Sequence, residues 1–294
     1  MKLAPLVRAA ASRPDLTHVI VHTGQHYDPE MSDAFFTQLG IPRPDHNLEA
    51  GSSSHAQQTA AIMERFEPVC LAVKPDVVLV YGDVNSTVAA ALVAEQGGAD
   101  RLELCDRLDV GGTTPGVTLI DEVRRRVRIP VSVMIRPRGG PYVHTPAELD
   151  QMQADVDTAR AHGADMLVIG LLDERGLVDV PHVRELVDRA GSTPVTFHRA
   201  FDEVSDQAAA LEVLIDAGIA RVLTGGGPAS AIEGVARLAQ LVAQADGRIT
   251  IMAGGTVRAH NVRAIVERSG VREVHARSEL DPSRIRDIVG ALER

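Results

Sequence analysis

The feature that most constrains the fold is a strand–helix unit that recurs from about residue 76 to residue 294. Short β-branched runs alternate with amphipathic stretches of helical length, and turns such as EQGGAD, AHGAD and DAGIA carry the Gly that ends a helix. Eight such units in about 220 residues favour a (β/α)8 TIM barrel over an open sheet. The eight strands are predicted at 77–81, 101–105, 131–136, 165–169, 194–198, 220–224, 248–253 and 271–275.

The first 75 residues do not fit this count. They begin with a helix at 3–12 and contain a strand at 17–24, a helix near 30–39 and a long helix from Ser54 to about Val73. A parallel strand needs a neighbour, and nothing in this segment is predicted to pair with 17–24. Two parts are therefore predicted: an incomplete Rossmann-like αβα appendage over 1–75, and a barrel over 76–294. The barrel helices are predicted near 86–97, 117–127, 146–162, 181–190, 206–217, 229–244, 259–268 and 282–292.

The composition excludes two classes of partner. The formal net charge of -10 argues against nucleic acid as a partner. No apolar run reaches the roughly 20 residues that span a bilayer, so no membrane segment is expected. Two cysteines, Cys70 and Cys105, with no signal peptide before them, predict a reducing cytoplasmic setting. A homo-oligomer is expected.

Polar side chains cluster where the predicted strands end. In a barrel, the active face is built at the carboxyl ends of the strands and in the loops that follow them. A ring of thiol, carboxylate, guanidinium and imidazole groups there predicts a ligand site. The residues in question are Asp83, Glu103, Cys105, Arg136, Arg138, His198, Arg199, Thr224, Gly225, Gly226, Gly227, Gly254, Gly255 and His275.

Two pairs in this ring suit an anionic substrate. His198 and Arg199 end the fifth strand, where His198 is a candidate general acid/base and Arg199 a candidate anion ligand. The alternative is a structural His198 whose ring bonds to backbone. Arg136 and Arg138 flank Pro137 and suit a phosphate or carboxylate. Their alternative role is an ion pair to a carboxylate of the rim, Glu103 or Asp106.

Glycine-rich turns follow the sixth and seventh strands. Backbone N–H groups at helix N-termini bind anions, so Gly225 and Gly226, and likewise Gly254 and Gly255, are candidate anion ligands. Tight turn geometry alone is the alternative. Cys105 is a candidate soft ligand for Cu(I), or else a small buried apolar side chain.

From about residue 94 the chain resembles the CutC family of copper homeostasis proteins. The likeness rests on EQGGADRLELCD, GGTTP, IPVSVMIRPRGG, PVTFHRAFDE, ASAIEG, GRITIMAGG and VREVHARS. This resemblance implies a (β/α)8 barrel and a role in copper homeostasis. It also implies Cu(I) binding by a pair of cysteines, of which one matches Cys105. The other lies on the family's first strand, and the predicted strand 77–81 has no Cys.

The first 93 or so residues resemble another family, the non-hydrolysing UDP-N-acetylglucosamine 2-epimerases. The matching stretches are KLAPLVRA, HTGQHYDPEMSDAFF, LGIPRPDHNLEAGSSSHAQQTA and KPDVVLVYGDVNSTVAAALVA. They correspond to a fragment of that family's N-terminal domain, which implies a gene fusion that supplies the first strand and helix of the barrel. Asp83 matches a catalytic position of that family, but the partner residues are missing, so a helix N-cap or a rim carboxylate is favoured.

Three functions follow as hypotheses. The first is copper binding and homeostasis, with Cys105 as ligand. The second is a barrel enzyme for a small anionic or phosphorylated metabolite, with His198 or Glu103 as acid/base. The third, residual epimerase-related activity, is disfavoured by the missing residues. The first two hypotheses differ in the side chains that they require, because copper needs thiols whereas an anion needs arginines.

Overall fold

The computed structural model describes residues 19–24, 42–51, 55–73, 84–227, 230–276 and 282–293. The chain divides into two compact units, one of residues 1–90 with 279–281 and one of residues 91–278 with 282–294. This division falls inside helix α4 (Val84–Gln96). The predicted helices at 3–12 and 30–39, and the predicted first barrel strand at 77–81, lie outside the described residues.

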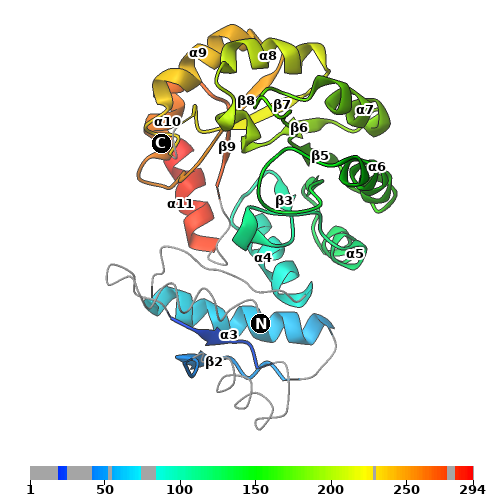
Figure 1. Cartoon of the computed structure of the whole chain (residues 1–294). Helices are drawn as coiled ribbons and strands as arrows, with labels where there is room; N and C mark the ends of the chain where they lie inside the picture. The colour runs from blue at the N-terminus through cyan, green and yellow to red at the C-terminus, as the bar shows by residue number, and fades with distance from the viewer. Residues whose placement is uncertain are drawn as a thin grey trace. The chain divides into compact units, whose positions relative to one another are not determined.

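The larger unit is built on a curled parallel sheet of seven strands (Figure 1). Neighbours in the sheet follow the order of the chain, with registers such as Leu104 beside Val133 and Val133 beside Leu167. This is the sheet of an α/β barrel, and seven of the eight strands predicted from the sequence are confirmed. They are β3 (Leu102–Leu104), β4 (Val131–Met134), β5 (Met166–Ile169), β6 (Val195–Phe197), β7 (Arg221–Thr224), β8 (Thr250–Gly254) and β9 (Glu273–His275).

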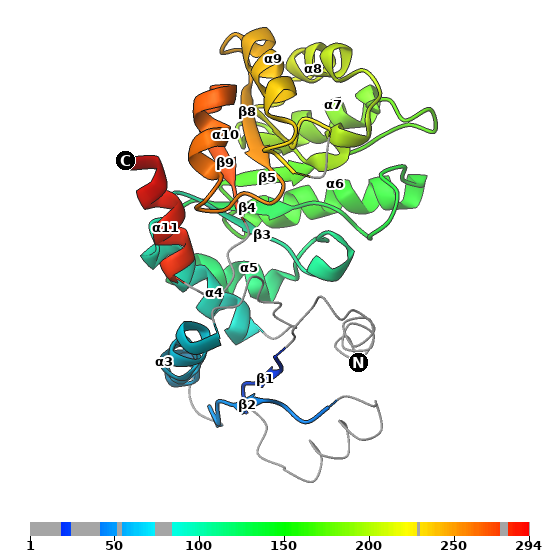
Figure 2. The ribbon, with the colours of Figure 1, turned by 90° about the vertical axis from the view of Figure 1, so that its left-hand side faces the viewer.

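Helices follow the strands and lie on the outer side of the curled sheet (Figures 1 and 2). Helix α6 shows why the sequence starts a helix where it does: Thr145 and Glu148 form a reciprocal capping box, and Pro146 follows the cap. One face of α6 is buried through Met152 and Val156. The other helices of this unit are α5 (Val117–Arg126), α7 (Val180–Ala190), α8 (Gln207–Asp216), α9 (Val235–Ala245), α10 (Val262–Ser269) and α11 (Pro282–Glu293).

Helix α9 begins six residues later than the predicted start at 229. Gly234 is its N-cap, and a Cβ at Gly234 would lie 1.8 Å from the carbonyl oxygen of Gly225. The turn after β7 therefore packs against the start of α9, and this close approach, which needs glycine, delays the helix.

The core of this unit lies between the sheet and the helices and inside the curl of the sheet. All four residues of β4 and all three of β6 are buried, so these strands are covered on both faces. Burial on both faces is what short, uninterrupted apolar strands predict for a parallel sheet. Phe197, Leu167 and Ile169 are among its fully buried side chains.

Side chains join the two outer strands of the seven-stranded order. Arg101, next to β3, donates to Glu273 of β9 at 2.8 Å, and Arg221 of β7 contacts the same carboxylate at 3.1 Å. Two residues further along both strands, Nε2 of His275 lies 3.6 Å from Oε2 of Glu103. These contacts hold β3 and β9 close, because parallel strands set equivalent positions at the same height.

The smaller unit has its own core and sheet in the part that the structure describes. Strand β1 (Val21–His22) pairs in parallel with β2 (His46–Asn47), and helix α3 (His55–Val73) contributes Ile62, Phe66 and Cys70 to a buried cluster. The expectation that nothing pairs with 17–24 is therefore wrong. The partner is a polar segment without a strand pattern, and it pairs through its backbone, which any non-proline residue can do.

None of the helices that the structure describes is long and apolar enough to cross a membrane.

Candidate functional site

The sequence-predicted site residues gather at one edge of the seven-stranded sheet. Cys105 follows β3, His198 follows β6, Gly254 ends β8 and His275 ends β9. Arg136 lies two residues after β4. Because all seven strands are parallel, their carboxyl ends meet at this edge, which is where barrel proteins bind their ligands.

Arg136 is a buried cation. Its residue is only 4% exposed, and its guanidinium donates to the carbonyl oxygens of Val110 and Gly112 at 3.1 Å and of Gly140 at 2.8 Å. Cζ lies 4.8 Å from the centre of the Tyr142 ring, which adds a cation–π contact. These partners are all uncharged, so they orient the guanidinium without neutralising it.

The predicted ion pairs of the two arginines with Glu103 or Asp106 are replaced by other contacts. Arg136 binds the carbonyl groups just described. Arg138 pairs with Glu148, with Nε of the arginine 2.5 Å from Oε1 of the carboxylate. The hypothesis of a bracing arginine is thus correct in kind for Arg138, but its partner lies on α6, beyond the rim residues that the sequence suggested.

The Arg138–Glu148 pair fixes the loop between β4 and α6. Arg138 also donates to the carbonyl oxygens of Val143 at 2.8 Å and of Pro141 at 3.0 Å. The hydrogen bond from Arg138 lowers the pKa of Glu148 to about 2, and the backbone N–H of Thr145 contributes in the same direction. Because the guanidinium of Arg138 is already paired with Glu148 and hydrogen-bonded to the backbone, Arg138 has a structural role in this loop.

His198 is buried as a neutral imidazole. It is 5% exposed, and the backbone N–H of Ala200 donates to its Nδ1 at 3.1 Å. Burial, and then the charge of Arg136, lower its pKa to about 3. Since Nδ1 accepts a hydrogen bond, the proton of the neutral ring is on Nε2. His198 is therefore a hydrogen-bond donor towards the site at neutral pH.

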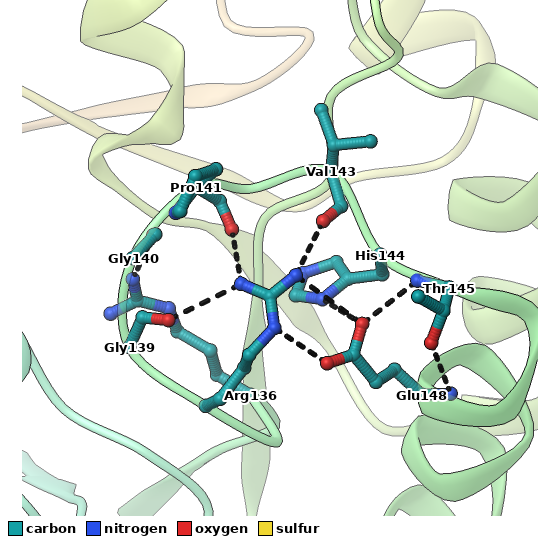
Figure 3. Close-up of polar contacts among 9 residues, drawn as sticks. Arg136, Gly139, Gly140, Pro141, Val143, His144, Thr145 and Glu148 are labelled. Atoms are coloured by element: carbon teal, nitrogen blue, oxygen red, sulfur yellow. Dashed lines mark hydrogen bonds and ion pairs between the residues drawn. The ribbon is translucent and has the colours of Figure 1, made fainter.

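A second buried imidazole, which the sequence reasoning missed, lies in the same region. The side chain of His144 is 1% exposed, and its ring is drawn close to Thr145 and Glu148 in Figure 3. Burial, and then the charge of Arg138, lower the pKa of His144. Tyr142 was missed as well, although its ring centre lies 5.0 Å from that of His198. The only signal was their place in the loop after the third predicted strand, at 131–136.

The lowered pKa of His198 predicts a pH-dependent stability. Below 6.5 the unfolded chain protonates this ring while the folded chain keeps it neutral, so the free energy of unfolding falls as the pH falls from 6.5 towards 3. Between pH 7 and pH 5 the loss expected from His198 is about 2 kcal/mol. The shift at His144 acts in the same direction. Urea unfolding at several pH values measures this slope.

The variants His198→Gln and His260→Gln separate this effect from general acid sensitivity. His198→Gln removes the titrating ring and should flatten the slope between pH 7 and pH 5. His260 is exposed, so His260→Gln is a matched control that should leave the slope unchanged. An unchanged slope in His198→Gln would contradict the prediction.

The glycine turn after β7 is filled by a carboxylate of the chain itself. The side chain of Asp202 is 7% exposed and accepts from the backbone N–H of Gly225 and of Gly227, each at 3.1 Å. The hydroxyl of Thr224 donates to the same carboxylate, and Arg199 pairs with it at 2.7 Å. The predicted anion ligands Arg199 and Gly225 thus bind an internal anion, which an external one would have to displace.

Gly226 has another partner, and the turn after β8 has a different reason for its glycines. The N–H of Gly226 donates to Oγ of Thr224 at 2.8 Å. A Cβ at Gly254 would lie 2.4 Å from Cδ1 of Leu223, and Gly255 has φ +109°. Close packing and backbone geometry therefore require both glycines of the second turn. Their anion binding stays a prediction.

The side chains of Cys105 and Met134 both reach Gly112. A Cβ at Gly112 would lie 3.3 Å from Sγ of Cys105 and 3.5 Å from Cε of Met134, so both side chains end at the same glycine. Among the residues that the structure describes, no group of three or more His, Cys, Asp and Glu side chains could hold a metal ion. Cys70 lies in the buried core of the smaller unit.

Two family models match the chain. Residues 84–280 match the CutC family, and residues 8–99 match UDP-N-acetylglucosamine 2-epimerase. The two matches overlap in residues 84–99, which contain helix α4. The same helix therefore carries the features of both families.

Relatives and solved structures agree with the first of these matches. The human copper homeostasis protein cutC homolog is 47% identical over 197 residues, which are 66% of this chain and 72% of the human protein. The structure of CutC from Streptococcus agalactiae is similar with a TM-score of 0.58 and 38% identity, over 60% of this chain and 87% of that one.

A more distant structural likeness concerns the fold alone. The aldolase QR15 is similar with a TM-score of 0.54 at 16% identity, over 74% of this chain and 94% of that one. The CutC family model, by contrast, spans more than half of the chain and covers the strands, the buried histidines and Cys105. The chain belongs to the CutC family.

Proposed function

We propose that this chain acts in copper homeostasis by binding Cu(I), with Cys105 as a ligand. The proposal rests on one observation: the Cys105 thiol and the end of the Met134 side chain both lie next to Gly112. Thiolate and thioether sulfurs are the ligands that select Cu(I), and two or three such donors suffice. The human relative's name supports the same role. Met134 would take the place of the first-strand cysteine that the family likeness implies.

The proposed setting is the cytoplasm, because Cu(I) and the thiols of Cys70 and Cys105 persist in a reducing compartment. We also propose that residues 1–75 are an epimerase-derived appendage joined to the barrel by gene fusion, as the overlap of the two matches at 84–99 suggests. Epimerase-related activity remains the least supported alternative, because that match ends at residue 99.

A competition titration with a chromogenic Cu(I) chelator tests the copper proposal. Cys105→Ala should weaken Cu(I) binding by about tenfold or more, because it removes the only thiolate near Met134 among the described residues. Cys70→Ala, in the core of the smaller unit, is the matched control and should leave the affinity unchanged. Equal affinities of the wild-type and Cys105→Ala proteins would remove the copper proposal.

A second candidate function is a barrel enzyme that acts on a small anionic metabolite. The observation that favours it is the buried guanidinium of Arg136, whose described hydrogen-bond partners are all uncharged carbonyl groups. In this candidate Glu103 is the acid/base residue. His198 is a neutral donor that stabilises negative charge on the substrate, a role that suits an imidazole with a pKa of about 3.

A further inference from the structure

Four buried nitrogen atoms near the carboxyl ends of β4 and β6 have no hydrogen-bond partner in the part of the chain that the structure describes. They are Nε of Arg136, both ring nitrogens of His144, and Nε2 of His198. A buried polar group without a partner costs about 1 to 3 kcal/mol. Three such side chains in one region are therefore too expensive to be explained as packing, and they indicate a ligand.

The three side chains belong to one cluster. The Tyr142 ring lies between two of them, with its centre 4.8 Å from Cζ of Arg136 and 5.0 Å from the ring centre of His198. The charge of Arg136 lowers the pKa of both imidazoles, and His144 lowers that of His198. Gly170, after β5, packs directly against the ring of His198. The cluster is thus assembled from the ends of three adjacent strands.

The chemistry of the cluster selects an acceptor. Nε of Arg136 carries a proton at all relevant pH values. Nε2 of His198 carries one because Nδ1 of this ring accepts from Ala200. Neutral His144 adds one further N–H, whichever of its nitrogens holds the proton. A metal cation at Nε2 of His198 would need the lone pair that this protonated nitrogen lacks.

The charge of the cluster points to a ligand with a single negative charge. The cluster contains one cation, Arg136, and two neutral rings. The carboxylates nearby are paired with other arginines, Glu148 with Arg138 and Asp202 with Arg199. Oε2 of Glu148 also lies 3.9 Å from Nδ1 of His144, beyond hydrogen-bond distance. A singly charged carboxylate would neutralise Arg136. A phosphate dianion would bring excess negative charge into a buried region, which is unfavourable.

We propose that Arg136, His144 and His198 bind the carboxylate group of a small metabolite. This inference rests on the second candidate function, whose substrate class it names. Arg138, Arg199 and Gly225, which the sequence also suggested as anion ligands, are not part of this site, because their described contacts are with Glu148 and Asp202.

Acetate is the probe for this site, and the imidazole signals of protein labelled with nitrogen-15 histidine are the readout. Acetate, added at constant ionic strength against chloride, should shift the Nε2–H signal of His198 and the ring signals of His144 in a saturable way. Arg136→Gln should weaken this binding by about tenfold or more, since it removes a buried charge partner. Arg263→Gln removes the same charge from an exposed ion pair and should leave the midpoint unchanged.

Arg136→Lys keeps the positive charge, so this second variant tests the site even if Arg136→Gln fails to fold. It loses the Nε–H donor and should also weaken acetate binding in a protein that retains its wild-type circular dichroism. Acetate that leaves the signals of His144 and His198 in place would overturn the site. Phosphate that shifts them with a lower midpoint than acetate would overturn the carboxylate assignment. Acetate binding detected by calorimetry without these shifts would overturn the site while leaving the second candidate function standing.

Discussion

Gly170→Ala is expected to destabilise the protein by about 3 to 4 kcal/mol. A Cβ at this position would lie 1.9 Å from Cε1 and 2.1 Å from Nδ1 of His198, so it would overlap the imidazole ring. The ring cannot move away freely, since Nδ1 is held by Ala200 and the backbone N–H of His198 donates to Ile169 at 2.8 Å. The substitution therefore either expels the ring or separates β5 from β6.

Urea unfolding with Gly116→Ala as control measures this cost. No atom lies within 4 Å of a Cβ at Gly116, and its φ is -66°, so alanine fits there without strain. Gly170→Ala should also lose most of the pH dependence between pH 7 and pH 5, because an expelled His198 titrates as it does in the unfolded chain. A loss of stability below about 1 kcal/mol would contradict this prediction, because it would mean that the His198 ring can move aside to accommodate the new methyl group.

Asp202→Ala is expected to cost about 3 to 5 kcal/mol. It leaves the buried N–H of Gly225 and the buried hydroxyl of Thr224 without this acceptor, and it removes one ion-pair partner of Arg199. The carboxylate joins the loop after β6 to the turn after β7, so its removal should loosen both. Denaturant unfolding compares this variant with Asp216→Ala, which changes an exposed carboxylate at the end of α8.

Two further measurements separate the lost acceptor from lost packing. Asp202→Asn keeps the shape and one acceptor oxygen, so it should fall between the wild type and Asp202→Ala. Formate should restore part of the stability of Asp202→Ala, because the N–H groups of Gly225 and Gly227 can then bind an external anion. Stability equal to that of Asp216→Ala would contradict the structural role of Asp202.

The fold could be read from the sequence to a large extent, because its signals are local. Six of the seven strands lie within the predicted ranges, and β8 extends one residue beyond its range, since short β-branched runs between glycine turns define strands without tertiary information. The polar segment around His46, which pairs with β1, has no such pattern. The late start of α9 at Val235 could not be predicted from the sequence either, because it depends on the close packing of Gly234 against Gly225.

The sequence predicted where the site lies but not which of its residues pair with one another. Arg136 and His198 were identified because they end strands, and both lie in the buried cluster. The sequence could not show that Arg138 is bound to Glu148, or that Asp202 occupies the glycine turn. The pairing of charged side chains depends on distances of a few ångströms between loops. The spacing of residues along the sequence does not determine such distances.

The sequence by itself determined the alternation of strands and helices, the parallel sheet that follows from it, and the edge of that sheet where the polar residues end. These follow from hydrophobic periodicity and turn chemistry, which act between near neighbours in the chain. Only the tertiary structure decided which of those residues remain available to a ligand. Arg138 and Gly225 bind carboxylates of the chain itself, whereas Arg136 and His198 are buried with donors that lack acceptors among the described residues. The physical reason is that burial raises the cost of an unmet charge or hydrogen bond, and burial is set by packing of residues distant in sequence.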